Sequence, residues 1–315
     1  MPSVTGNGSI QLFRLAGVDV FLHWSWFVVA AYEIQAHDRR YTSIVWSILE
    51  YLALFLIVLT HEFGHAMACR QVGGTANRIV LWPLGGVAFV KPPQRPGATL
   101  WSIAAGPLVN VALLPILFAG FMIGRWLGWE QTLPDAYQFV WSILLIDAVL
   151  LAFNILPVYP LDGGQILRSL LWYWLGRGRS LLVVTILGFI GITVFVGIAL
   201  FTWSLWTGAL GVFMLLNCWG GLKHARELLR LAKLPRRPDF ACPSCKTAPP
   251  AGAFWKCGRC HQAFDTFETL GVCPHCGAQY ATTMCLDCEE QRPMNDWVVP
   301  AYASSGVLNG GLPAR

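Results

Sequence analysis

Charged residues are scarce in this chain. Asp, Glu, Lys and Arg make up 12% of its 315 residues, whereas 55% are hydrophobic. A soluble globule of this length needs a more polar surface than such a composition provides. The composition therefore excludes an ordinary soluble protein and favours an α-helical protein that crosses a membrane several times.

Long apolar runs are plentiful, and a run of about 18 residues is long enough to cross the hydrocarbon layer as a helix. We expect six spans, at 17–34, 44–69, 98–123, 136–157, 180–201 and 203–222. A cleavable signal is not evident, since the polar stretch SVTGNGSIQLFR precedes the first run. Lys and Arg gather in the loops that are internal if the N-terminus is cytoplasmic. We therefore expect an integral protein of the cell (inner) membrane with both termini in the cytoplasm.

Cysteine is nearly absent from the apolar part, where only Cys69 and Cys218 occur, at span ends. The other eight cysteines lie in a polar region that follows the proline-broken basic segment PRRPDF. This change in composition predicts a domain boundary near Leu234. We expect a membrane domain over 1–234, a linker over 235–240, a zinc-binding domain over 241–292 and a disordered tail over 293–315.

The eight clustered cysteines form four CxxC pairs, and cytoplasmic thiols are kept reduced, which favours metal over disulfides. Pairing in chain order predicts two zinc ribbons, each with one structural zinc ion. The first set is Cys242, Cys245, Cys257 and Cys260, and the second is Cys273, Cys276, Cys285 and Cys288. Basic and acidic side chains nearly balance there, so nucleic-acid binding is not expected. A structural module or one that docks a protein partner is favoured.

The second apolar run ends in HEFGH, which places His61 and His65 one helical turn apart on the same face. Two imidazoles at this spacing can share a zinc ion, and Glu62 beside them can take a proton from a metal-activated water. Such polar groups are costly at the end of an apolar span and need a reason. The alternative is a hydrogen-bonded structural cluster.

A catalytic zinc needs a third protein ligand, and FNILPVYPLDGG at the end of the fourth run offers Asp162. Pro157 and Pro160 forbid regular helix before it, and two glycines let the backbone turn after it. Both motifs lie at the cytoplasmic ends of their spans, hence at similar depth. Residues 77–90 between the second and third runs suit a β-hairpin, which we interpret either as a wall of the active-site chamber or as an ordinary packing loop.

These paired motifs, with LHWSW, PLGG and GPLVN, resemble the site-2 protease family of intramembrane zinc metalloproteases, peptidase family M50. The resemblance covers about residues 9–230. It implies that His61, His65 and Asp162 bind the catalytic zinc, that Glu62 is the general base and that membrane-anchored regulators are cleaved within the bilayer. It also points to Asn154 and Asn110, whose amides could contact substrate or the developing oxyanion. Helix-to-helix hydrogen bonding is an equal alternative for both.

Asp147 lies in the middle of the fourth run, where a carboxyl group is costly. We expect it to bond to a polar partner such as Asn110 or His23, in a structural role, and we interpret His23 as a packing residue.

Two other functions compete with proteolysis. A metal transporter would use buried histidines and carboxylates but has no special need for Glu62. A non-catalytic membrane anchor for the ribbons would not need intact metal ligands.

Overall fold

The computed structural model describes residues 4–5, 8–36, 40–82, 85–202 and 205–299 of the chain. The chain divides into two compact units, residues 1–223 and 224–315, and each is described here by itself. The division falls inside the last long helix rather than at the expected boundary near Leu234, and the boundary set by composition stays a prediction.

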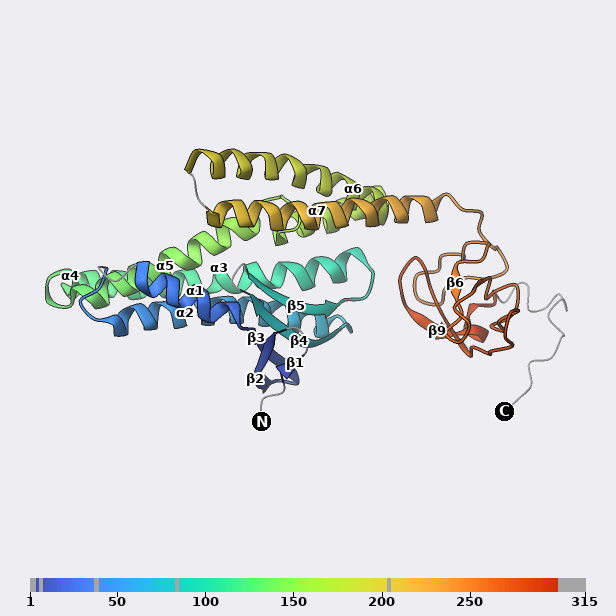
Figure 1. The fold of residues 1–315 in the computed structure, drawn as a ribbon, viewed down its shortest axis with the longest axis horizontal. Coiled ribbons are helices and arrows are strands. Elements are labelled where there is room, and N and C mark those ends of the chain that lie inside the picture. The colour runs from blue at the N-terminus through green and yellow to red at the C-terminus, as the bar shows by residue number, and fades with distance from the viewer. Residues whose placement is uncertain (1–3, 6–7, 37–39, 83–84, 203–204, 300–315) are drawn as a thin grey trace. The chain divides into compact units, whose positions relative to one another are not determined.

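The first unit is mostly helical (Figure 1). Its helices are α1 (Ser25–Ala36), α2 (Ile44–Gln71), α3 (Pro96–Trp126), α4 (Trp129–Thr132), α5 (Pro134–Ile155), α6 (Asp162–Thr202) and α7 (Leu205–Ala232), which continues into the second unit. The Ser43 hydroxyl caps α2 by accepting a hydrogen bond from the Val45 N–H. Proline begins α3 and α5, where its missing N–H costs no hydrogen bond. Gly176, with φ of 77°, divides α6 at a kink.

Four helices are long and apolar enough to cross a membrane: α2, α3, α5 and residues 162–198 of α6. They correspond to the second to fifth expected spans. The expected span at 17–34 is wrong in its first part, because residues 18–23 form a strand. The helix that follows, α1, has 12 residues, about 18 Å in length against a hydrocarbon layer of about 30 Å. The sixth expected span, 203–222, falls in α7, which is not among these four helices. Residues 203–204 of that expected span lie outside the described part.

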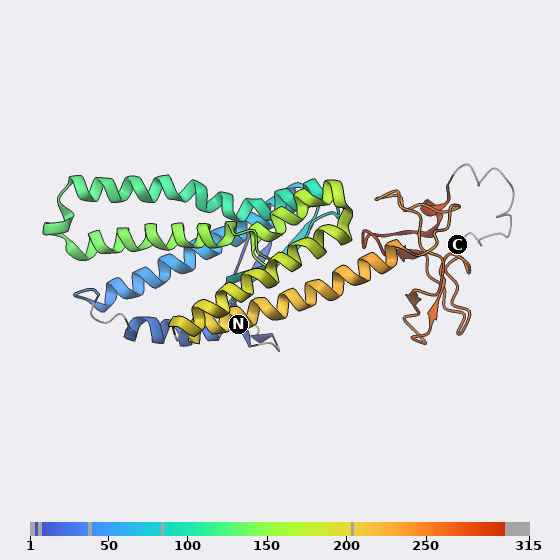
Figure 2. The same cartoon turned by 90° about the horizontal axis from the view of Figure 1, so that it is seen from above.

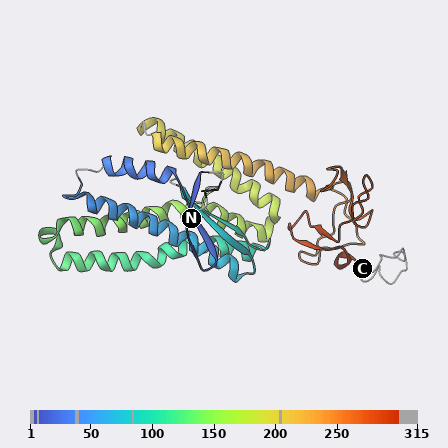
Figure 3. The same ribbon diagram turned by 60° about the horizontal axis from the view of Figure 1, so that its bottom comes forward.

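A five-stranded sheet packs against the C-terminal half of α2 (Figure 3). The strands are β1 (Val4–Thr5), β2 (Ser9–Leu15), β3 (Val18–His23), β4 (Thr75–Trp82) and β5 (Gly85–Lys91), in spatial order, with only β3 and β4 parallel. Alternate residues of β3 and β4, such as Val18, Val20, Ile79 and Leu81, are fully buried against α2. The predicted hairpin is confirmed as β4 and β5, although residues 83–84 at its turn are outside the described part.

Helices α2, α3 and α5 lie side by side (Figure 2), and α6 packs against α3. The segment between α5 and α6 contains Pro157 and a cis peptide bond before Pro160. Its residues Val158, Tyr159 and Leu161 pack on a small core made by α6 and α7. This packing holds the segment in place and sets the position of Asp162, the first residue of α6.

The second unit contains two short hairpins and a 3₁₀ helix. The hairpins pair β6 (Trp255–Lys256) with β7 (Ala263–Phe264) and β8 (Thr282–Met284) with β9 (Gln291–Pro293), and the 3₁₀ helix η1 is Met294–Trp297. The expected disorder from residue 293 is wrong for this stretch. Trp297 is 1% exposed and packs on Phe267, with ring centroids 4.9 Å apart. A unit this small has few apolar side chains, so the buried Trp297 ring forms a large part of its hydrophobic core. Residues 300–315 of the expected tail lie outside the described part.

Candidate metal centre and thiolate clusters

His61 and His65 lie on one face of α2, and both side chains are buried. Their Nε2 atoms are 3.1 Å apart, as expected for residues one helical turn apart. Asp162 enters from the start of α6, and its Oδ2 lies 3.1 Å from His61 Nε2 and 3.3 Å from His65 Nε2. The structure thus brings together the three side chains that the sequence predicts as ligands.

The spacing of these three atoms fits a zinc ion. Zn–N and Zn–O bonds of 2.0–2.1 Å at tetrahedral angles separate neighbouring ligand atoms by about 3.3 Å. Gly106 of α3 faces the same space. A Cβ atom on Gly106 would lie 2.3 Å from His65 Nε2 and 2.8 Å from His61 Nε2. Only glycine at this position keeps the space beside both nitrogens open.

The other ring nitrogens of the two histidines face hydrogen-bond acceptors on α3. His65 Nδ1 lies 2.9 Å from the Ser102 carbonyl oxygen, and His61 Nδ1 lies 2.6 Å from Asn110 Oδ1. Because both partners accept, each Nδ1 carries the proton and each Nε2 presents its lone pair toward Asp162. Such outer contacts fix the orientation of imidazole ligands around a metal.

Glu62 is buried beside the two histidines and is held by the hairpin. Its Oε2 accepts a hydrogen bond of 3.0 Å from the Ala88 N–H of β5. A Cβ on Gly86 would lie 2.2 Å from Glu62 Cγ, so the strand approaches the carboxylate as closely as glycine allows. The hairpin is therefore a wall of this site rather than a remote packing loop.

Asn110 is fully buried, and both ends of its amide are engaged. Its Oδ1 faces His61 on α2, and its Nδ2 donates to Asp147 Oδ1 of α5 at 2.6 Å. These contacts are helix-to-helix hydrogen bonds, one of the two alternatives that the sequence offers for Asn110, and a contact of Asn110 with substrate stays a prediction. Asn154 is half-buried near the end of α5, and within the described part of the chain its side chain makes no hydrogen bond. Its contact with substrate stays a prediction.

The expected polar partner of Asp147 is confirmed as Asn110 and not His23. The His23 ring stacks on Trp82 with centroids 3.9 Å apart, and its Nδ1 lies 2.6 Å from Ser25 Oγ. It is a packing residue, but within the strand β3 rather than within the expected span. The sequence reasoning assigned no role to Gly106, Gly86, Ala88 and Ser102, although the segments GPLVN and PLGG were signals for the two glycines.

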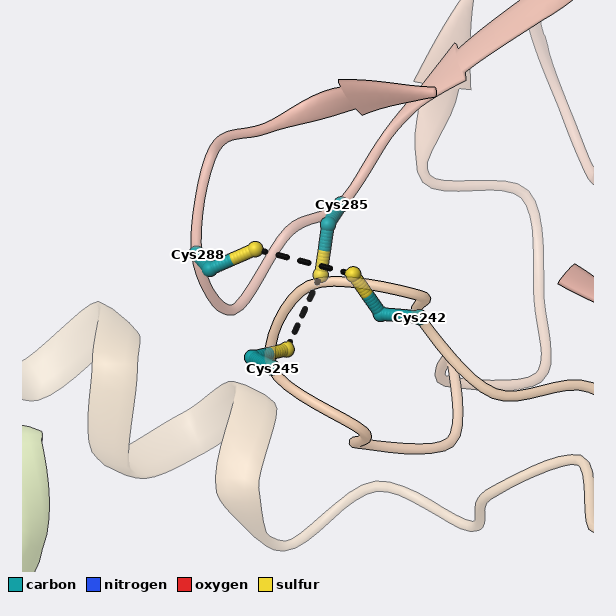
Figure 4. A group of neighbouring side chains, drawn as sticks. All are labelled: Cys242, Cys245, Cys285 and Cys288. Carbon is teal, nitrogen blue, oxygen red and sulfur yellow. Dashed lines mark hydrogen bonds between the residues drawn. The ribbon is translucent and has the colours of Figure 1, made fainter. Parts of the chain in front are cut away.

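The eight clustered cysteines are all free thiols and form two groups of four. One group is Cys242, Cys245, Cys285 and Cys288 (Figure 4), and the other is Cys257, Cys260, Cys273 and Cys276. The predicted pairing in chain order is therefore wrong, because the second group is nested inside the first. The cause lies in the flanking segments. Ala241 donates its N–H to the Trp297 carbonyl and Phe240 pairs with Val298, so the first and last CxxC turns meet.

Both thiol groups have the dimensions of zinc sites. The Sγ atoms of Cys242 and Cys288 are 3.6 Å apart, and those of Cys245 and Cys285 are 3.8 Å apart. In the nested group the corresponding distances are 3.5 Å and 3.7 Å. Zn–S bonds of 2.3 Å give tetrahedral edges of about 3.8 Å. The hydrogen bond between Cys245 and Cys285 lowers the pKa of Cys245 to about 4 and raises the pKa of Cys285, so in this pair Cys245 is the thiolate and Cys285 keeps the proton.

Known proteins resemble the part of the chain that holds this site. A model of peptidase family M50 matches residues 50–126 and 123–198. A zinc metalloprotease of Methanocaldococcus jannaschii is 30% identical over 167 residues, 52% of this chain and 46% of that protein. A Synechocystis protein with the provisional name of zinc metalloprotease is 26% identical over 243 residues, 70% of this chain and 61% of that protein.

The fold also matches a solved structure. The site-2 protease from Methanocaldococcus jannaschii superposes with a TM-score of 0.50 at 24% identity, covering 68% of this chain and 95% of that one. This chain spans about half the length of the curated relatives it matches. The matched residues include the whole of HEFGH and Asp162. The chain is similar to peptidase family M50 over residues 50–198, which contain both motifs of the candidate metal centre.

Proposed function

We propose that this chain is an intramembrane zinc metalloendopeptidase of the site-2 protease type. One observation carries the proposal: three ligand atoms from two apolar helices converge within 3.3 Å of one another, with a buried glutamate next to one of them in sequence. The names of the relatives support the same activity. A metal transporter or a non-catalytic anchor gains no support from this arrangement, because neither requires Glu62 to be fixed by Ala88.

His61, His65 and Asp162 would hold the zinc ion. When bound there, zinc supplies Lewis-acid activation of water and of the peptide carbonyl. Glu62 takes a proton from the attacking water while the water oxygen adds to the carbonyl carbon of the peptide bond. Glu62 then returns the proton to the amide nitrogen as the C–N bond breaks, which leaves one new carboxyl group and one new amino group. The Ala88 N–H holds the carboxylate of Glu62 in place for both transfers.

The substrate is a membrane-spanning protein that reaches the centre from the bilayer, in regulated intramembrane proteolysis. Asn154 is a candidate for contact with the substrate backbone. The two thiol groups hold one structural zinc ion each, and with the ion at His61, His65 and Asp162 the chain binds three zinc ions. The region they build is a docking module for a protein partner rather than for nucleic acid.

Both termini are in the cytoplasm and the host membrane is the cell (inner) membrane, because Lys and Arg concentrate in the corresponding loops. A reporter that is active only in the cytoplasm, fused after Arg315, should therefore be active. Its counterpart that is active only outside the cell membrane should be silent, and activity of that second fusion would contradict the orientation.

Co-expression with candidate single-span membrane proteins tests the activity. Wild type should yield a cut fragment, and Glu62→Gln should yield none while keeping its zinc, because the change removes the base but no ligand. Glu50→Gln is the matched control, since Glu50 lies at the opposite end of the same helix and bonds to Tyr41 and Arg40. A fragment that persists in Glu62→Gln would contradict the proposed mechanism.

A further inference from the structure

A chain of buried hydrogen bonds leads away from the metal centre through three helices. His61 Nδ1 on α2 lies 2.6 Å from Asn110 Oδ1 on α3, and Asn110 Nδ2 lies 2.6 Å from Asp147 Oδ1 on α5. The three residues are 4%, 0% and 0% exposed. The mechanism above uses His61 alone.

The two hydrogen bonds have a defined direction. The Asp147 oxygen accepts, so it requires the NH₂ end of the Asn110 amide to face it. The amide oxygen of Asn110 must then face His61, and this oxygen can only accept. His61 therefore carries its proton on Nδ1 and leaves the Nε2 lone pair free for a metal.

Without Asp147 nothing in this chain of bonds prevents the Asn110 amide from turning over. Its NH₂ end would then donate to His61 Nδ1, which places the imidazole proton on Nε2. That tautomer has no lone pair on the side of Asp162 and His65. Asp147 thus selects the form of His61 that binds metal, although it does not contact the histidine.

A role limited to joining α3 and α5 does not account for a carboxyl group at this position. The Asp147 Oδ2 atom is buried and has no hydrogen-bond partner among the described residues, and a carboxyl group inside an apolar span is costly. A neutral amide or hydroxyl group could join two helices at lower cost.

We propose that Asp147 is a positioning residue for the metal centre, acting through Asn110 to fix the tautomer and orientation of His61. The inference rests on the proposed function, since it assumes that His61 binds zinc.

Four variants of the full chain in detergent separate this role from simple helix packing. Asp147→Ala removes the acceptor, and Asp147→Asn replaces it by an amide that can donate as well as accept, so the Asn110 amide is no longer held in one direction. Asn110→Asp places beside His61 a carboxylate that can only accept, which keeps the proton on Nδ1 without help from Asp147. The exchange Asn110→Asp with Asp147→Asn restores both bonds, because the new aspartate accepts from His61 and from the new asparagine. Ser142→Ala, also buried on α5, is the matched control.

The measurement is the chelator concentration that removes the most weakly held zinc ion from each variant, together with its thermal unfolding temperature. Asp147→Ala should lose about 10- to 100-fold in zinc affinity, as found when outer partners of metal ligands are removed, and Asp147→Asn should lose part of this. Asn110→Asp, the exchanged pair and Ser142→Ala should stay close to wild type.

Unchanged zinc affinity in Asp147→Ala would overturn the inference. So would an exchanged pair that binds zinc no better than Asp147→Asn alone, a comparison that remains decisive if Asp147→Ala does not fold. A wild-type chain that holds no zinc outside its thiol groups would overturn the proposed function instead, which keeps the two failures distinguishable.

Discussion

At the scale of single residues, Gly106 controls the space in which the metal would sit. A Cβ atom there would come within 2.3 Å of His65 Nε2, well inside van der Waals contact. Gly106→Ala should therefore strongly reduce zinc binding at this site and abolish cleavage. Metal analysis of the purified variant checks the expectation.

Gly120 provides the control for Gly106, since it lies on the same helix and a Cβ there would meet nothing closer than 3.9 Å. Gly120→Ala should keep both zinc and activity. If Gly106→Ala kept its full zinc content, the metal could not occupy the space between the two Nε2 atoms.

The sequence predicts the ligands better than their surroundings. His61 and His65 are four residues apart on one helix, so local geometry alone brings them together. Asp162 was found from the prolines and glycines around it. The roles of Gly106, Ser102 and Asn110 depend on how α3 crosses α2, and no local pattern encodes that crossing. The sequence leaves substrate contact and helix-to-helix bonding open for Asn110 for the same reason, because its two partners come from distant parts of the chain.

At the scale of elements, the nesting of the CxxC pairs can be tested by double substitution. Replacing Cys242 and Cys285 by Ser removes two ligands from one site, so the chain should lose one zinc ion. Replacing Cys242 and Cys257 removes one ligand from each site, so both ions should be weakened or lost. Zinc content per chain distinguishes the two variants.

Pairing in chain order would reverse this result. Cys242 and Cys257 would then belong to one site, and their joint loss would cost a single zinc ion. The four-thiolate spacing is visible in the sequence, but the pairing is set by contacts between residues 240–241 and 297–298, far apart along the chain.

A second element shows why apolar content alone misleads. Residues 18–23 continue directly into the apolar helix α1, so a window of hydrophobicity joins them into one run. In the structure they form β3, whose side chains are buried against α2 and β4 instead of lipid. The run of Val18, Val20 and Leu22 at every second position is a strand signal, but Phe21 and the apolar residues of α1 that follow conceal it.

At the scale of the whole molecule, the sequence predicts a helical membrane part and a cysteine-rich part, and both are present. The first expected span differs from the structure at its start, where residues 18–23 form a strand instead of a helix. The metal centre draws on residues that are about 100 positions apart, His61 and Asp162. The metal centre forms only when α2, α3 and α6 have packed together. Zinc binding at this centre therefore shows that these three helices are correctly packed.

Zinc content per chain is the most direct test of the central claim, that His61, His65 and Asp162 form one zinc site distinct from the two thiolate sites. Wild type should hold three zinc ions. Asp162→Ala removes one of only three protein ligands from an open site, so it should hold two, both in the closed thiolate sites. An Asp162→Ala chain that still held three zinc ions would contradict the claim, because its third ligand would then lie elsewhere.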